Sequence, residues 1–230
     1  MCTSARGFED FKNRRCDVHL CSSWRYFAWH SWPSLAESER VGPAPQDGYR
    51  CDVAMQDSPD PRFRELSADL LRGLTDNDLV SAVYAHVLHH VLPDLAHELT
   101  IVAGLPKAVS AIYVTTLLDN EVLNGGFHQF FWNSSGEFAL MALEGLERLG
   151  APKHAAVLQS AIATFETERA VFDRYRALDT SEAFSESVQR SSLGALDEQY
   201  YDLGFDALTD LQASYIRSHL DEFESPERAA

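Results

Sequence analysis

The segment at residues 117–136, LLDNEVLNGGFHQFFWNSSG, concentrates side chains that could exchange protons or bind a polar ligand. A carboxylate and an imidazole can form a general acid–base pair, and neighbouring amides can orient a substrate. No nucleophile with a positioned base accompanies them. One hypothesis is therefore a small-ligand binder or enzyme with a polar pocket in this segment. Its lining would be Glu121, Asn124, His128, Gln129 and Asn133.

A structural interpretation of the same residues competes with the pocket. In the helix that leads into the segment, Glu121 shares the apolar face of Leu117. Asp119 shares a face with Thr115 and Thr116, and we expect that face to be solvated. A carboxylate aimed at the core is costly unless it accepts hydrogen bonds, so Glu121 must find donors nearby.

The turn that follows could provide those donors. Asn124, Gly125 and Gly126 are a helix-stop and turn signal, and their N–H groups are expected to fold back onto Glu121. We favour this structural network, which would fix how two helices turn on each other, over catalysis. Aromatic residues then recur at helical spacing and are expected in the core: Phe127, Phe130 and Phe131.

Metal binding and cofactors are not expected. His86 and His90 are spaced i, i+4 on one helix, but no H-E-x-x-H pattern and no third ligand accompany them. The four cysteines precede residue 52 and lack paired Cys-x2-Cys spacing: Cys2, Cys16, Cys21 and Cys51.

Carboxylates near the C-terminus form the second candidate site. Glu198, Asp202, Asp206 and Asp210 repeat at steps of four, which on one continuous helix would make a stripe with neighbours ~5–6 Å apart. Such spacing is close to that of a run of phosphates. Gly204 is expected to break the helix, which would make Asp206 a cap or first-turn acid. The remaining acids assigned to this surface are Asp221, Glu222 and Glu224.

The overall charge of the chain also favours a cationic partner. The chain has 35 acidic and 19 basic residues, for a formal net charge of −16. Such a surface repels nucleic acid and anionic membranes and attracts cationic partners. An acidic face that only keeps the protein in solution is the competing interpretation.

Helix signals position these residues. Thr75 with Asp78, and Ser134 with Glu137, have capping-box spacing, and the second helix is expected to end at Leu149. No run of alternating strand residues appears, so we predict an all-α, multi-helix bundle. The expected helices cover residues 75–92, 94–103, 106–123, 134–149, 152–177, 181–190, 194–203 and 206–224.

Residues 1–60 differ from the rest and are predicted to be a poorly ordered extension, with the helical domain at 61–230. No apolar run reaches the ~20 residues of a membrane span. The N-terminus lacks the apolar run of a secretory signal. We therefore expect a soluble protein of the cytoplasm.

The pattern LDNEVLNGGFHQFFWNSSG, with the later LERLGA, LDEQYYDL and YIRSHLDEF segments, resembles the family of unknown function 4375 over about residues 99–224. That family is also named after the C-terminal domain of DNA mimic protein 19. The resemblance implies an all-helical bacterial domain, with at least one member a dimeric acidic mimic of double-stranded DNA. We therefore expect a protein-binding module and not an enzyme. It would occupy the DNA-binding face of a regulator or another basic DNA-binding protein, without binding nucleic acid itself, and it could form a homodimer.

Overall fold

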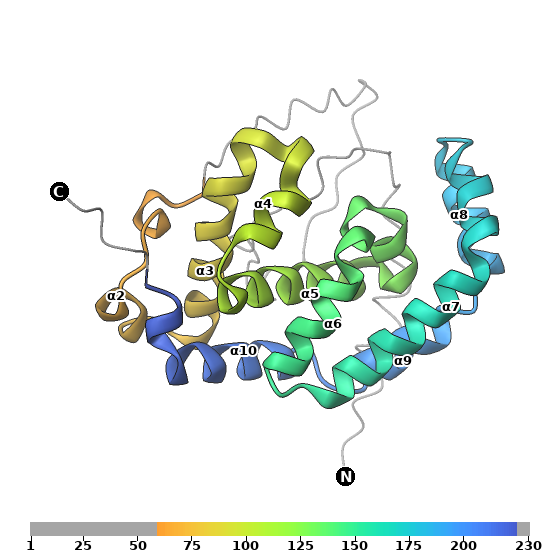
Figure 1. Ribbon diagram of the computed structural model, residues 1–230. Coiled ribbons are helices and arrows are strands. Elements are labelled where there is room, and N and C mark those ends of the chain that lie inside the picture. Colours follow the sequence, from red (N-terminus) through yellow and green to blue (C-terminus); the bar gives the residue numbers. More distant parts are fainter. Residues whose placement is uncertain (1–58, 225–230) are drawn as a thin grey trace, which may run out of the picture.

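The computed structural model describes residues 59–224, which form helices joined by short connections (Figure 1). No β-strand occurs within that range, so the all-α prediction is confirmed for the described part of the chain. The α-helices are α2 (Ala68–Arg72), α3 (Asp76–Val91), α4 (Glu98–Gly104), α5 (Lys107–Trp132), α6 (Ala139–Arg148), α7 (Pro152–Arg176), α8 (Ser181–Arg190), α9 (Gly194–Tyr201) and α10 (Ala207–Ser218). The 3₁₀ helices are η2 (Pro61–Phe63), η3 (Leu92–His97), η4 (Ser134–Phe138) and η5 (Leu220–Glu222).

Helix α5 is the centre of the fold. α3, α6, α7, α9 and α10 all pack against it, and η4 folds back on its C-terminal half. A helix covered on so many sides must be apolar nearly all round. Ile112, Leu118 and Val122 of α5 are accordingly fully buried. The other elements therefore take their positions from α5.

The face of α5 that carries Asp119 is not solvated, contrary to the prediction. Thr115 and Thr116 are buried because α10 covers them, and the side-chain amide of Gln212 donates to their hydroxyl oxygens at 2.9 and 3.0 Å. Asp119 is partly buried and accepts a hydrogen bond from the Tyr200 hydroxyl of α9 at 2.9 Å. The pattern of α5 alone did not reveal that two later helices pack on this face.

The predicted break after residue 123 is a kink inside α5. Gly125 has φ −151° and ψ 21°, and Gly126 has φ +75° and ψ 178°. The second conformation is open essentially only to glycine. The two halves of α5 therefore point in different directions, and the phenylalanine side chains of the second half are buried in the core.

One of the two capping predictions is confirmed. The N–H of Asp78 donates to the Thr75 hydroxyl oxygen at 3.3 Å at the start of α3. The box at Ser134 and Glu137 is wrong, because these residues lie in η4 and α6 begins at Ala139 without a side-chain cap.

The later helices lie close to their predicted ranges. α8 matches 181–190, and α7 and α9 end within two residues of the expected positions. The predicted helix at 206–224 is shorter, since α10 ends at Ser218 and η5 follows. Figure 1 shows α7 as a long rod with α8 at its far end, and α9 and α10 along the lower side of the view.

The predicted N-terminal extension lies outside the described residues, apart from Pro59 and Asp60. Asp60 contacts the helical part, because its carbonyl oxygen lies 3.0 Å from Nε2 of His89 on α3. None of the helices in residues 59–224 is both long and apolar enough to cross a membrane.

Candidate functional site

Glu121 is the centre of a buried hydrogen-bond network. Its side chain is 7% exposed. Its oxygens accept hydrogen bonds from Gln129 Nε2 at 2.7 Å, from Asn133 Nδ2 at 3.0 and 3.2 Å, and from Ser135 Oγ at 2.7 Å. These donors come from the second half of α5 and from η4. The network therefore fastens both segments to the first half of α5.

The donors predicted for Glu121 are not the ones observed. We expected the N–H groups of residues 124–126, but side chains supply every hydrogen bond to the carboxylate. Asn124 is exposed and takes no part. The kink at Gly126 turns the second half of α5 so that Gln129 and Asn133, a turn apart, both face Glu121.

The kink also creates a second carboxylate contact, which is partly buried. The N–H of Phe127, which begins the second half of α5, donates to Asp197 Oδ1 at 2.7 Å. A β-carbon on Gly126 would lie 2.3 Å from Asp197 Oδ2, so only glycine allows this approach. Burial raises the pKa of Asp197 to about 6, the Phe127 N–H partly offsets the rise, and the nearby Glu198 adds to it. α9 is thereby attached to the kink.

His128 lies in an aromatic box away from Glu121. It is 3% exposed, and the rings of Trp132, Phe172 and Phe184 surround it with centroids 4.3–5.9 Å away. Its Nε2 lies 2.8 Å from the Ser187 oxygen. The box therefore joins α5, α7 and α8.

The hydrogen bonds of Ser187 fix the tautomer of His128. The Ser187 hydroxyl donates to the carbonyl oxygen of Phe184 at 2.8 Å, so it accepts from His128 Nε2–H. Nδ1 is then an unprotonated acceptor, and it is buried with no hydrogen-bond partner among the described residues. Burial lowers the pKa of His128 to about 4; Glu168 opposes this and Arg176 adds to it.

The predicted polar pocket is therefore only partly assembled. Glu121, Gln129 and Asn133 meet, but Asn124 faces solvent and His128 bonds to Ser187. Glu121 and His128 form no hydrogen bond or ion pair with each other. The arrangement suits a satisfied core network better than proton transfer.

The four predicted acids Glu198, Asp202, Asp206 and Asp210 are exposed, and they belong to two helices and the turn between them. Gly204, at φ +100°, interrupts the helix between α9 and α10, as predicted. Glu198 lies in α9, Asp202 caps its C-terminus, Asp206 is the N-cap residue of α10, and Asp210 lies in its first turn. We call residues 198–210 the acidic turn.

Several carboxylates of the acidic turn are not neutralised. The side chains of Asp202, Asp206 and Asp210 form no hydrogen bond or ion pair within residues 59–224. A carboxylate at a helix C-terminus, as at Asp202, also opposes the helix dipole. Burial raises the pKa of Asp119 to about 6, with the charge of Asp206 adding to the rise and the Tyr200 hydroxyl opposing it. Residues 198–210 contain four exposed carboxylates and no Lys or Arg, so negative charge is concentrated at this turn.

The other predicted acids lie at the far end of α10, roughly 18 Å away for twelve residues at 1.5 Å each. Two of them already have partners. Glu222 pairs with Arg148 at 3.8 Å, and Glu224 accepts the N–H of Ala68 at 3.1 Å at the start of α2. Asp221 is exposed. The predicted acidic surface therefore divides into two groups.

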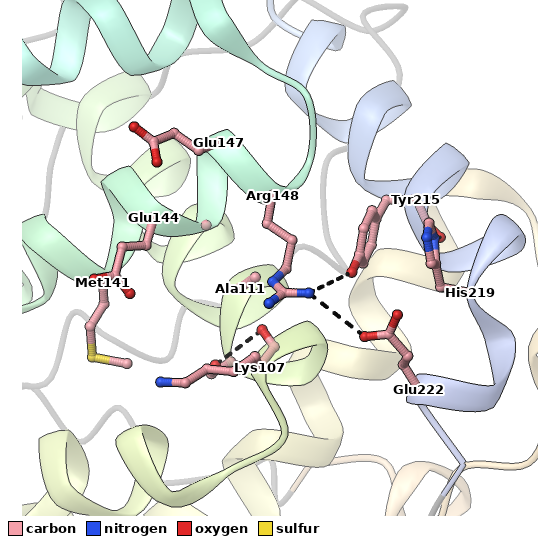
Figure 2. A pocket seen from close by; sticks show the side chains of 11 residues that line it. Lys107, Ala111, Met141, Glu144, Glu147, Arg148, Tyr215, His219 and Glu222 are labelled. Atoms are coloured by element: carbon pink, nitrogen blue, oxygen red, sulfur yellow. Dashed lines mark hydrogen bonds and ion pairs between the residues drawn. The ribbon is translucent and has the colours of Figure 1, made fainter.

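A cleft of about 480 Å³ lies between α5, α6 and the end of α10 (Figure 2). Arg148 crosses it, with Nη1 3.2 Å from the Tyr215 hydroxyl oxygen. Lys107, Glu144 and Glu147 also line it, so its charges are mixed. Glu222 is the only predicted site residue among its lining residues.

Within residues 59–224, no cluster of three or more His, Cys, Asp or Glu side chains could hold a metal ion. The rings of His86 and His90 lie 4.9 Å apart, and Nδ1 of His86 contacts the carbonyl oxygens of Phe63 and Arg64 at 3.2 and 3.0 Å. These contacts give His86 a structural role in holding η2 on α3, and the ring of His90 packs against the ring of His86.

Sequence reasoning missed four partners: Ser135, Ser187, Asp197 and Tyr200. Ser135 follows the polar segment directly, so its proximity to Glu121 was a usable signal. Asp197 and Tyr200 belong to LDEQYYDL, but they contact α5 across 70 and 81 positions in the chain. No local pattern predicts pairing over that separation.

One family model matches the chain. The family model described as DMP19-like protein matches residues 103–219, from the end of α4 to the end of α10. The matched range contains the kink, the Glu121 network and the acidic turn. No curated protein and no solved structure matches the chain. Because the match covers just over half of the 230 residues, the chain belongs to the DMP19-like protein family.

Proposed function

We propose that this protein is an acidic protein-binding module that mimics double-stranded DNA. In this proposal it occupies the DNA-binding face of a transcriptional regulator or another basic nucleic-acid-binding protein. The family is named for a DNA mimic protein, and the acidic turn provides the chemistry. Enzymatic activity is not part of the proposal.

Three carboxylates of the acidic turn that have no partner within the described residues, those of Asp202, Asp206 and Asp210, are the observation that carries the proposal. Asp202, Asp206 and Asp210 are exposed and lack partners within residues 59–224. Like charges four residues apart in a helix repel each other, and lysine or arginine side chains of a partner would relieve such repulsion. DNA-binding faces present such side chains at intervals that match phosphates.

The geometry gives less support to the alternative, a small-ligand binder or enzyme at Glu121 and His128. Three donor side chains already occupy the Glu121 oxygens. The cleft of Figure 2 lies elsewhere, and neither Glu121 nor His128 lines it.

Affinity capture with the full chain as bait, followed by elution with duplex DNA, tests the proposal. We expect basic DNA-binding proteins to be retained and then released by the duplex. A bait with amides at Glu198, Asp202, Asp206 and Asp210 should retain much less of them. Retention of the same proteins by both baits, or a complex that duplex DNA does not disrupt, would contradict the proposal.

A further inference from the structure

Phe205 stands at the tip of the acidic turn with its ring in solvent. It is 62% exposed and is the only aromatic residue among the exposed large hydrophobic side chains of the described range. Isolated exposed aliphatic residues are common on protein surfaces and need no explanation. Phe205 differs from these residues because it lies between Asp202 and Asp206, whose side chains have no hydrogen bond or ion pair within residues 59–224.

The turn holds Phe205 in a defined position. The ring stacks on Tyr201 with centroids 6.4 Å apart and an interplanar angle of 19°. The Tyr201 hydroxyl donates to the carbonyl oxygen of Val122 in α5 at 3.0 Å, and Leu203 packs against the core. The left-handed backbone of Gly204 reverses the chain just before the ring. Phe205 is therefore displayed from a turn that is fixed to the central helix.

The charges around Phe205 indicate which surface would cover it. Interface hot spots are commonly aromatic residues that enter a recess and are surrounded by a polar rim that excludes water. Here the sequence around Phe205 is anionic, since Asp202 precedes it and Asp206 and Asp210 follow it within five residues. The complementary surface would be an apolar recess bordered by lysine or arginine.

We propose that Phe205 is the apolar anchor of the acidic turn and inserts into such a recess on a basic partner protein. The proposal rests on the proposed function and refines it. Carboxylates alone would attract many DNA-binding proteins, whereas Phe205 would select those with a recess between their basic residues.

Two synthetic peptides of equal length and charge test the anchor, one an amphipathic lysine–leucine helix and the other with every leucine replaced by serine. Their affinities for the full chain are measured by fluorescence anisotropy. We expect the lysine–leucine peptide to bind about tenfold more tightly, the size of a modest hot spot. The variant F205A should lose that preference, and F205W should keep it.

L140A is the matched control, because Leu140 on α6 is 67% exposed and lies outside the acidic turn. It should bind both peptides like the wild type. A preference that persists in F205A would overturn the anchor. If the four amide substitutions still abolished binding in that case, the acidic surface and the proposed function would stand.

Two other outcomes would also overturn the anchor. A wild-type chain that binds neither peptide would contradict both the anchor and the acidic mimic. If F205A instead converted a dimer to a monomer in analytical ultracentrifugation, and the peptides bound without preference, a second copy of the chain would be the occupant of this surface.

Discussion

His128 should make the stability of the fold depend on pH in a predictable direction. The unfolded protein takes up a proton on this residue near pH 6.5, but the folded protein does so only near pH 4, because the box is buried. The contribution of His128 is therefore complete above pH 6.5 and is lost as the pH falls from 6.5 through 4. At about 1.4 kcal/mol for each pH unit between the two values, the loss amounts to about 3 kcal/mol.

The variant H128Q tests this value, because glutamine is neutral and can still donate to Ser187. Urea unfolding of both proteins is measured at intervals from pH 7 to pH 4. On acidification the wild type should lose about 3 kcal/mol more of its free energy of unfolding than H128Q does. The exposed His97 provides the control variant H97Q, which should follow the wild type. Parallel curves for the wild type and H128Q would refute the reasoning.

Three further substitutions test the sites around the kink. E121A strands three donor side chains and should lower the free energy of unfolding by about 1–3 kcal/mol in urea titrations; full stability would contradict the network. D119N should raise the melting temperature at pH 8, because the raised pKa of Asp119 means that its charge opposes folding above about pH 6. The increase in melting temperature should vanish near pH 4, and a D119N variant that melts like the wild type at pH 8 would contradict the argument that burial raises the pKa of Asp119. G126A should lower the free energy of unfolding by about 1–3 kcal/mol in thermal melts, because an L residue is strained at φ +75° and its β-carbon would clash with Asp197. A melting temperature close to that of the wild type would contradict the requirement for glycine at the kink.

Local sequence signals predicted the helices well where a capping residue marks the end of the helix. Thr75 caps α3, and α8, which matches its predicted range, is capped by Thr180. Ser134 failed as a cap because η4 folds back on α5, which places the neighbouring Ser135 against Glu121. A local capping pattern cannot predict that a tertiary contact will give the same turn a different conformation.

The candidate site was predictable to the extent that its residues are close in sequence. The aim of Glu121 toward the core followed from its helical face, and Gln129 and Asn133 were named as its neighbours. The solvation predicted for Asp119 was wrong because α9 and α10 cover that face of α5. Contacts with helices that are distant in sequence decide whether a face is buried, and the periodicity of one helix cannot predict those contacts.

The salt dependence of the association rate tests the central claim most directly. The wild type and the variant with amides at Glu198, Asp202, Asp206 and Asp210 are each mixed with a captured DNA-binding protein at two salt concentrations. Screening acts over ~8 Å at 0.15 M, so attraction from the acidic turn should weaken steeply as salt rises. We predict a wild-type association rate that falls strongly with salt and a slower, nearly salt-independent rate for the amide variant. Equal rates for the two proteins at both salt concentrations would contradict the account.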